Sequence, residues 1–212
     1  MPFIALHGWL DNSASFEVLA PQLSSVQCLA LDLAGQGFSD HQPGLNDYPL
    51  WSEVAAVYNI ADQMGWKRFG LIGHSRGAMM ALLTAGVYPE RISHLVMIDS
   101  LLPPLVEPEQ AVQRMTDSLK EIQFRISRPM SLYASYDDAI LARCLSRFAP
   151  IGKEAAERLA SRGLREVDGR FHWHADGKLW APSNIAMSSD IFDAYSAEDD
   201  HRRQLNMITF SS

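Results

Sequence analysis

The stretch Phe69-Gly-Leu-Ile-Gly-His-Ser-Arg-Gly-Ala78 decides how the rest of this chain can fold. Its first residues are apolar or glycine, which is typical of a strand buried on both faces. Gly73-His-Ser-Arg-Gly77 then follows as a G-x-S-x-G pattern. Small or apolar residues at helical spacing come next and predict a helix: Ala78, Ala81, Leu82 and Ala85. A buried strand, a tight turn and a helix are the context in which G-x-S-x-G predicts a nucleophile elbow.

The two glycines of this pattern have a physical reason. A serine on so sharp a turn sits in a strained backbone conformation. Gly73 and Gly77 must therefore lack side chains if the strand and the helix are to approach each other. The turn lifts the hydroxyl of Ser75 above the edge of the sheet and places its backbone at a helix N-terminus. Gly-rich turns also bind phosphate, but that alternative requires G-x-x-x-x-G-K-[ST], which the chain does not contain.

The composition is that of an ordinary globular protein, and it limits the classes of partner. The 212 residues, 47% of them hydrophobic and 20% charged, suffice for one domain with an inserted lobe. A net charge of −7 argues against nucleic acid and an anionic membrane surface, so we expect a small-molecule partner. Cys28 and Cys144 lack metal-binding spacing, which favours a reducing, cytoplasmic compartment. No apolar run is long enough to span a membrane, and Met1–Leu6 lacks the basic region of a signal peptide.

Strands and helices alternate through the first part of the chain. Apolar runs predict strands over residues 2–6, 26–33, 69–72 and 92–98. Apolar residues at helical spacing predict a helix between the second and third of these: Val54, Val57, Tyr58 and Ala61. Asp32 is expected to organise the glycine-rich loop over 35–40. The alternation predicts an α/β fold with a doubly wound, mostly parallel sheet.

The pattern changes after residue 102. Helical spacing predominates in the chain that follows, over 107–127, 132–148 and 153–162. Residues 164–179 alternate instead, and Asp176-Gly177 is expected to be the turn of a hairpin there. We therefore divide the chain into a core over 1–102, a mainly helical cap over 103–200 and the start of a returning core strand over 201–212.

Several segments together resemble one known family. They are His7-Gly8-Trp9, Asp32-Leu-Ala-Gly-Gln-Gly-Phe-Ser-Asp40, Gly73-His-Ser-Arg-Gly77, Tyr88-Pro-Glu-Arg91 and Leu95-Val-Met-Ile-Asp99. This set resembles the α/β-hydrolases over nearly the whole chain. The segments His7-Gly-Trp-Leu-Asp-Asn12 and Phe171-His-Trp-His-Ala-Asp-Gly177 are most similar to the serine hydrolase-like proteins of that superfamily. The resemblance implies an α/β-hydrolase fold with an inserted helical cap, and a serine hydrolase that acts on an ester or related acyl substrate.

The resemblance also implies roles for particular residues. Ser75 would be the nucleophile that attacks the acyl carbonyl, with Gly73 and Gly77 as the elbow glycines. The oxyanion would be held by two backbone N–H groups. One belongs to Arg76, directly after the nucleophile, and the other to Trp9, in the loop after the first strand.

The acid and the base are harder to place. The expected chain order is serine, then acid, then histidine. Asp99 follows a strand after Ser75 and is a candidate acid, although some relatives take the acid from the next strand and a cap or turn role is equally open. None of the histidines after the serine follows the last strand, where the base is expected. They are His94, His172, His174 and His201. The H-x-H pair has no third ligand cluster, so we expect no metal and no other cofactor.

The resemblance begins at the family's third strand and stops at the start of the seventh. About two strands and two helices, on the order of 35–60 residues, would then be missing, and the base histidine with them. We therefore expect the chain to be inactive or impaired as it stands, with residues 96–98 left as an apolar edge of the sheet. The alternatives are a ligand-binding protein on the same fold, and an acyltransferase or perhydrolase that uses the same elbow.

Overall fold

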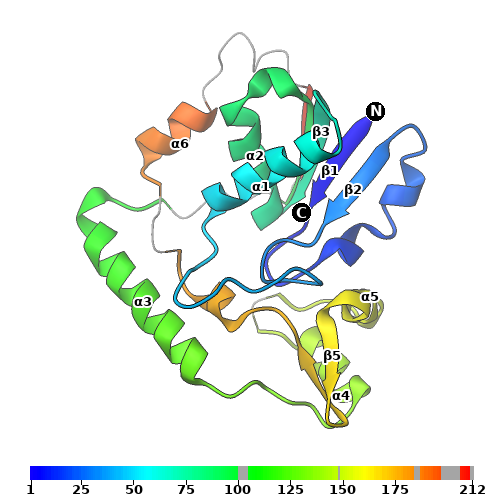
Figure 1. Cartoon of the computed structure of the whole chain (residues 1–212), viewed down its shortest axis with the longest axis vertical. Helices are drawn as coiled ribbons and strands as arrows, with labels where there is room; N and C mark the ends of the chain where they lie inside the picture. Colours follow the sequence, from blue (N-terminus) through cyan, green and yellow to red (C-terminus); the bar gives the residue numbers. More distant parts are fainter. Residues whose placement is uncertain (100–104, 148, 184–186, 197–205, 211–212) are drawn as a thin grey trace.

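A parallel sheet forms the centre of the molecule (Figure 1). The computed structural model describes residues 1–99, 105–147, 149–183, 187–196 and 206–210. Within these residues the main sheet has five strands, all paired in parallel, in the order β2-β1-β3-β4-β7. They are β1 (Pro2–Leu6), β2 (Gln27–Leu31), β3 (Phe69–His74), β4 (Ile92–Ile98) and β7 (Asn206–Phe210). The predicted α/β class and parallel sheet are confirmed.

Both faces of this sheet are covered by other elements. Successive side chains of a strand point to opposite faces, so β1, β2, β3 and β4 each contribute to the apolar clusters on both sides. From β1, Ile4 and Leu6 join the core beneath α1 (Leu50–Gln63) and α2 (Arg76–Val87), which Figure 1 shows lying across the strands. The helix pattern predicted for α1 is confirmed, since Val54, Val57, Tyr58 and Ala61 are all buried. On the other face, Phe3 packs in a second apolar cluster with side chains from the segment after β1. That segment contains η1 (Ser13–Phe16) and η2 (Ala20–Gln22).

The expected apolar edge at residues 96–98 does not exist. β4 pairs with β3 on one side and with β7 on the other, and Val96 lies in register with Ile208. The expectation was wrong because strand pairing joins residues far apart in sequence, which local patterns do not reveal. Among the described strands, β2 and β7 are the edges.

A mainly helical segment lies between β4 and β7, and Figure 1 shows α3, α4, α5 and β5 below the sheet. The short helix η3 (Pro89–Arg91) precedes β4. The described elements between β4 and β7 are η4 (Pro108–Gln110), α3 (Ala111–Ser127), α4 (Tyr136–Cys144), α5 (Lys153–Gly163), β5 (Leu164–Val167), β6 (Arg170–Trp173), η5 (Gly177–Trp180) and α6 (Ser189–Ser196). The helix expected over 132–148 is shorter than expected. Ser135 caps it by accepting a hydrogen bond from the Asp138 N–H, and Tyr133 pairs instead with Phe171. Residue 148 lies outside the described residues.

The hairpin turn is at a different Asp-Gly pair from the one expected. β5 and β6 are antiparallel, and Asp168 and Gly169 between them have φ of 51° and 72°. These positive angles are those of a tight turn of type I′. The pair Asp176-Gly177 instead begins η5, where the Asp176 carboxylate accepts a hydrogen bond from the Lys178 N–H. Both pairs have the local chemistry of a turn, and only the pairing of the strands decides between them.

The helical segment is joined to the carboxyl ends of the core strands by polar contacts. The Asn12 amide donates to the Leu159 carbonyl of α5 at 2.9 Å. Asp32 accepts from the backbone N–H groups of Ser13 and Phe38 and pairs with Arg162 of α5 at 2.7 Å. Burial alone would raise the pKa of Asp32, but the hydrogen bond from Arg162 and those from the backbone lower it to about 2. The predicted loop-organising role of Asp32 is confirmed.

Among the described residues, no helix is both long enough and apolar enough to cross a bilayer.

A buried histidine ties the end of β1 to the chain after β2. His7 is fully buried, and its Nε2 accepts a hydrogen bond from the Leu33 N–H at 3.0 Å. Its Nδ1 must then carry the proton and donate to the Gly8 carbonyl at 2.8 Å. Burial lowers the pKa of His7 from its usual value near 6.5 to about 4. His7 is therefore a neutral structural residue at neutral pH.

His7 should make the stability of the protein depend on pH. Between about pH 6.5 and pH 4 the unfolded chain protonates this side chain and the folded chain does not, so folding loses on the order of 3 kcal/mol as the pH falls through that window. In H7Q the glutamine can still accept from Leu33 but does not titrate. Urea denaturation of both proteins at several pH values should show the wild-type advantage shrinking towards pH 4, and a constant difference would contradict the assignment.

Candidate active site

Ser75 occupies a strained position between β3 and α2. Its φ of 50° and ψ of −115° lie outside the regions that non-glycine residues favour, at a cost of about 1–3 kcal/mol. The residue caps the N-terminus of α2, and its carbonyl accepts a hydrogen bond from the Ala78 N–H at 3.0 Å. Its own N–H donates to the Ile98 carbonyl at 2.9 Å, which holds the turn against the end of β4. Strand, turn and helix are arranged as the sequence predicts.

The glycines on either side leave no room for a side chain. A Cβ on Gly73 would lie 2.4 Å from the Cα of Ala78, inside the first turn of α2. A Cβ on Gly77 would lie 2.1 Å from the carbonyl oxygen of Leu6, at the end of β1. Both obstacles are backbone atoms, which cannot move aside as a flexible side chain can. The two glycines therefore let α2 approach β1 and β3 closely enough to form the turn.

The loop after β1 lies beside this turn. A Cβ on Gly8 would be 2.9 Å from Nδ1 of His74, so the two segments are in direct contact. Leu10 has a φ of 61°, and its N–H donates to the side-chain oxygen of Gln36 at 2.8 Å. The Trp9 indole donates to the Leu179 carbonyl of η5 at 2.8 Å, which fixes the loop from the side of the helical segment. The structure thus brings Trp9 and the serine turn into one region.

Arg76 directs its side chain away from the turn into a buried ion pair. The guanidinium lies 3.4 Å from the Glu53 carboxylate of α1, and the side chains are only 11% and 6% exposed. It also donates to the Tyr48 carbonyl at 2.7 Å. Burial raises the pKa of Glu53, and the attraction of Arg76 opposes that effect. Removing one partner would leave the other charge buried without compensation, so this pair fixes the first turn of α2.

Asp99 lies directly after β4, on the same edge of the sheet as the serine turn. It has a φ of 48°, in the left-handed region that aspartate tolerates better than most residues. Because the Ser75 N–H is bonded to the carbonyl of Ile98, the residue after Ile98 begins next to the turn. This position is compatible with an acid of the site and equally with a turn residue.

None of the histidines discussed as candidate bases is seen next to Ser75 among the described residues. His94 is four residues before the end of β4, or roughly 13 Å along the strand. The rings of His41 and His174 stack at 4.5 Å, close to His172, and burial lowers the pKa of His174. His201 lies outside the described residues. Among the residues that the structure covers, no group of three or more His, Cys, Asp or Glu is arranged to hold a metal ion.

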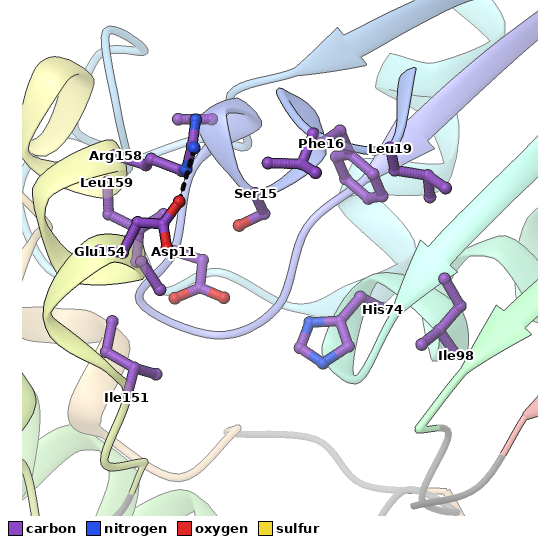
Figure 2. Close-up of a pocket in the computed structure, with 13 residues that line it drawn as sticks. Asp11, Ser15, Phe16, Leu19, His74, Ile98, Ile151, Glu154, Arg158 and Leu159 are labelled. Carbon is purple, nitrogen blue, oxygen red and sulfur yellow. Dashed lines mark hydrogen bonds and ion pairs between the residues drawn. The ribbon is translucent and has the colours of Figure 1, made fainter. Parts of the chain in front are cut away.

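A pocket of about 550 Å³ opens beside the turn, within the size range of small-molecule sites (Figure 2). His74 and Ile98, at the carboxyl ends of β3 and β4, line one side, and residues of η1 and α5 line the others. Most lining side chains are apolar: Ala14, Phe16, Val18, Leu19, Ile98, Ile151, Ala155 and Leu159. The charged residues are already paired, since Glu154 accepts from Arg158 at 2.8 Å and Asp11 pairs with Arg143 at 3.0 Å.

Comparison with known proteins agrees with this geometry. Residues 1–124 match the family model described as alpha/beta hydrolase fold. The chain belongs to this family. A hypothetical protein from Pseudomonas aeruginosa PAO1 gives a TM-score of 0.88 at 35% identity, over 100% of this hydrolase-fold chain and 83% of that one. The thioesterase domain of the curacin biosynthetic pathway gives a TM-score of 0.73 at 19% identity, over 100% and 84% of the two chains, and shares the fold.

The curated relatives include serine hydrolase-like proteins. The one from Danio rerio is 32% identical over 89% of this α/β-hydrolase chain and 59% of its own length, and the one from Mus musculus is 31% identical over 86% and 60%. The 2-(acetamidomethylene)succinate hydrolase of Mesorhizobium japonicum is 28% identical over 89% and 64%. The chain therefore spans about 60% of the length of these relatives. The resemblance to the serine hydrolase-like proteins of the α/β-hydrolases is confirmed.

The sequence patterns did not point to Glu53 or Tyr48, which contact Arg76 through buried polar groups. They pointed to Asp176 only as a turn residue, whereas its carboxylate accepts a hydrogen bond from Tyr48. The one sequence signal for Glu53 was its position directly before Val54, beside the apolar stripe that predicts the buried face of α1. Tyr48 and Asp176 are 128 positions apart, and nothing local connects them.

The requirement for glycine at position 77 can be tested by adding a single carbon. G77A places a Cβ against the Leu6 carbonyl, so we expect a loss of stability of about 1–3 kcal/mol or more. G152A is the matched control, because a Cβ there meets no atom within 4 Å and the backbone is already in an ordinary conformation. Its cost should stay below about 1 kcal/mol. Equal denaturation midpoints for the two variants would contradict the close approach of α2 to β1.

Proposed function

We propose that this chain carries the nucleophile of a serine hydrolase that acts on an ester or a related acyl substrate. The observation that carries the proposal is the backbone of Ser75, strained at the N-terminus of α2 between two glycines that admit no side chain. In the reaction, the Ser75 oxygen bonds to the acyl carbon while a base removes its proton. The carbonyl electrons move to oxygen and then return, which breaks the bond to the alkoxide. The alkoxide takes the proton from the base and leaves as the alcohol, and water then releases the acid from the acyl-enzyme by the same two steps.

The proposed oxyanion donors are the backbone N–H groups of Trp9 and Arg76. Arg76 begins α2, so its N–H points out of a helix N-terminus, where negative charge is stabilised. Trp9 belongs to the loop whose Gly8 touches His74, which supports a second donor on the facing side. Loss of one such donor reduces the rate by about 10²–10³-fold in serine hydrolases.

The proton-transfer half of the site is proposed to depend on residues beyond these. Asp99 is the candidate acid, and none of the described histidines is assigned as base. His7 in particular uses both ring nitrogens within the fold. Without a base Ser75 remains a weak nucleophile, so we propose that the chain is impaired as it stands. It would retain at most the roughly 10³–10⁴-fold acceleration that binding and an oxyanion hole supply.

The proposed substrate is a small molecule with an apolar acyl group. The pocket beside the turn is mainly apolar, and its charged residues are already held in ion pairs. We propose that residues 103–200 act as a cap over this pocket, since α5 forms one of its walls. Cys28 and Cys144 are both free thiols, which supports the proposed cytoplasmic location. Neither nucleic acid nor a membrane is proposed as a partner.

Labelling with a fluorophosphonate probe tests the nucleophile. The probe should modify the wild-type chain, slowly if no base is present, and S75A should not be modified at all. S15A is the matched control, because Ser15 is a serine that lines the pocket beside the turn but lies on η1. Intact-mass and peptide mass spectrometry would show the adduct. Equal modification of S75A would exclude Ser75, and binding of esters without any adduct in the wild type would favour the ligand-binding alternative.

The role of Asp99 is tested in a longer form of the protein that turns over p-nitrophenyl esters. If Asp99 orients the base, D99N should reduce kcat by about 10⁴-fold, because the amide favours the wrong histidine tautomer. The melting temperature should change little. A reduction of only a few fold would assign the acid to another residue and leave Asp99 as a turn residue.

A further inference from the structure

The two residues proposed as oxyanion donors are both held by their side chains. Trp9 donates its indole N–H to the Leu179 carbonyl of η5 at 2.8 Å, and its ring meets Trp180 edge-on at 4.6 Å. Arg76 donates to the Tyr48 carbonyl at 2.7 Å and pairs with Glu53. A backbone N–H can stabilise a developing charge only if its direction is fixed beforehand. The anchoring of these side chains therefore bears directly on the site.

Both anchors converge on one hydrogen bond. The Tyr48 hydroxyl donates to the Asp176 carboxylate at 2.5 Å, and Tyr48 is the same residue whose carbonyl accepts from Arg76. Tyr48 is 8% exposed, and its ring fills the space that a Cβ on Gly35 would occupy. Burial and the nearby carboxylate both raise the pKa of the Tyr48 hydroxyl, so it remains a donor at neutral pH.

Asp176 transmits this contact to the other anchor. Its side chain caps η5 by accepting from the Lys178 N–H at 2.9 Å, and the Leu179 N–H donates to its carbonyl at 3.0 Å. The carbonyl of Leu179 is the group that accepts the hydrogen bond from the Trp9 indole. The Asp176 carboxylate also lies 3.4 Å from the Lys178 ammonium, which supplies positive charge beside it, and 3.8 Å from the His41 ring.

We propose that Tyr48 and Asp176 are positioning residues for the oxyanion hole. Their hydrogen bond couples the Trp9 loop, held through η5, to the first turn of α2, held through Arg76. The catalytic role of these two residues rests on the proposed function. The structural coupling between the Trp9 loop and the first turn of α2 can be tested separately. It assigns to the helical segment a role in chemistry besides covering the pocket.

The test removes one hydroxyl group at each of two buried tyrosines. Y48F deletes the donor to Asp176. Y58F is the matched control, because the Tyr58 hydroxyl is also buried and donates to a carbonyl, that of Thr84 on α2, at 2.6 Å. Tyr58 packs against Phe69 at the opposite end of β3 from the serine turn. Each variant removes one buried hydroxyl, and Y48F also loses the hydrogen bond that Tyr48 accepts from the Gln42 N–H at 2.8 Å. A general loss of stability without coupling to the site should therefore affect the measurements below alike in both variants.

Two measurements are made on the 212-residue chain. In fluorophosphonate labelling of Ser75, Y48F should lower the maximal labelling rate by about tenfold or more, because poorly oriented N–H donors act almost as if one donor were removed. The probe concentration that gives half of the maximal rate should stay unchanged. Y58F should match the wild type within about twofold. In ¹⁵N NMR spectra, Y48F should shift the Arg76 amide and speed exchange of the Trp9 indole proton by about tenfold, and Y58F should do neither.

Each outcome decides one claim. Unchanged Trp9 and Arg76 signals in Y48F, or equal rate losses in both variants, would overturn the coupling. A wild type that is never labelled at Ser75 would overturn the proposed function, and the NMR comparison would still decide the coupling. If Y48F fails to fold, D176N replaces it, because one amide oxygen can still cap η5 while the amide nitrogen cannot accept from Tyr48. Its signals are judged by the same criteria.

Discussion

The approach of Gly77 to the carbonyl of Leu6 is the constraint on which the site depends. At that point α2 and the end of β1 are separated by less than a side chain would need. A side chain on Gly73 of β3 would likewise collide with the backbone of the first turn of α2. The strained backbone of Ser75 is stable only because the surrounding strands and helix fix it from three directions, including β4 through the Ile98 carbonyl. Close packing of the backbone thus holds Ser75, which is partly buried, in its strained conformation.

The polar contacts around this turn show how the strain is contained. Buried charges are costly unless paired, and Arg76 finds both a carboxylate and a carbonyl beneath the first turn of α2. The loop that carries Trp9 is held by Gln36 from one side and by η5 from the other. Each of these contacts joins the site to an element that is distant in sequence, so the geometry belongs to the whole fold rather than to the motif.

Sequence reasoning succeeded where structure is decided locally and failed where it is decided by pairing. The stripe of α1 and the strand over residues 92–98 follow from periodicity, and the serine turn follows from its glycines. The hairpin was misplaced because Asp168-Gly169 and Asp176-Gly177 have identical local chemistry. The pairing of β4 with β7 and the hydrogen bond between Tyr48 and Asp176 each join segments that are more than 100 positions apart in the sequence. No periodic pattern contains such information.

The two halves of the proposed site have different structural origins in this fold. The serine, its glycines and the proposed donors are fixed by β1, β3, α2 and η5, and those contacts are all present among the described residues. His7 shows that a histidine close to them need not take part, because burial makes it neutral and both its nitrogens already have partners. A base must instead have a ring nitrogen within hydrogen-bond reach of the serine and a pKa near the working pH. The proposed nucleophile and the proposed oxyanion donors are therefore positioned by the sheet and its adjoining helices, independently of the base.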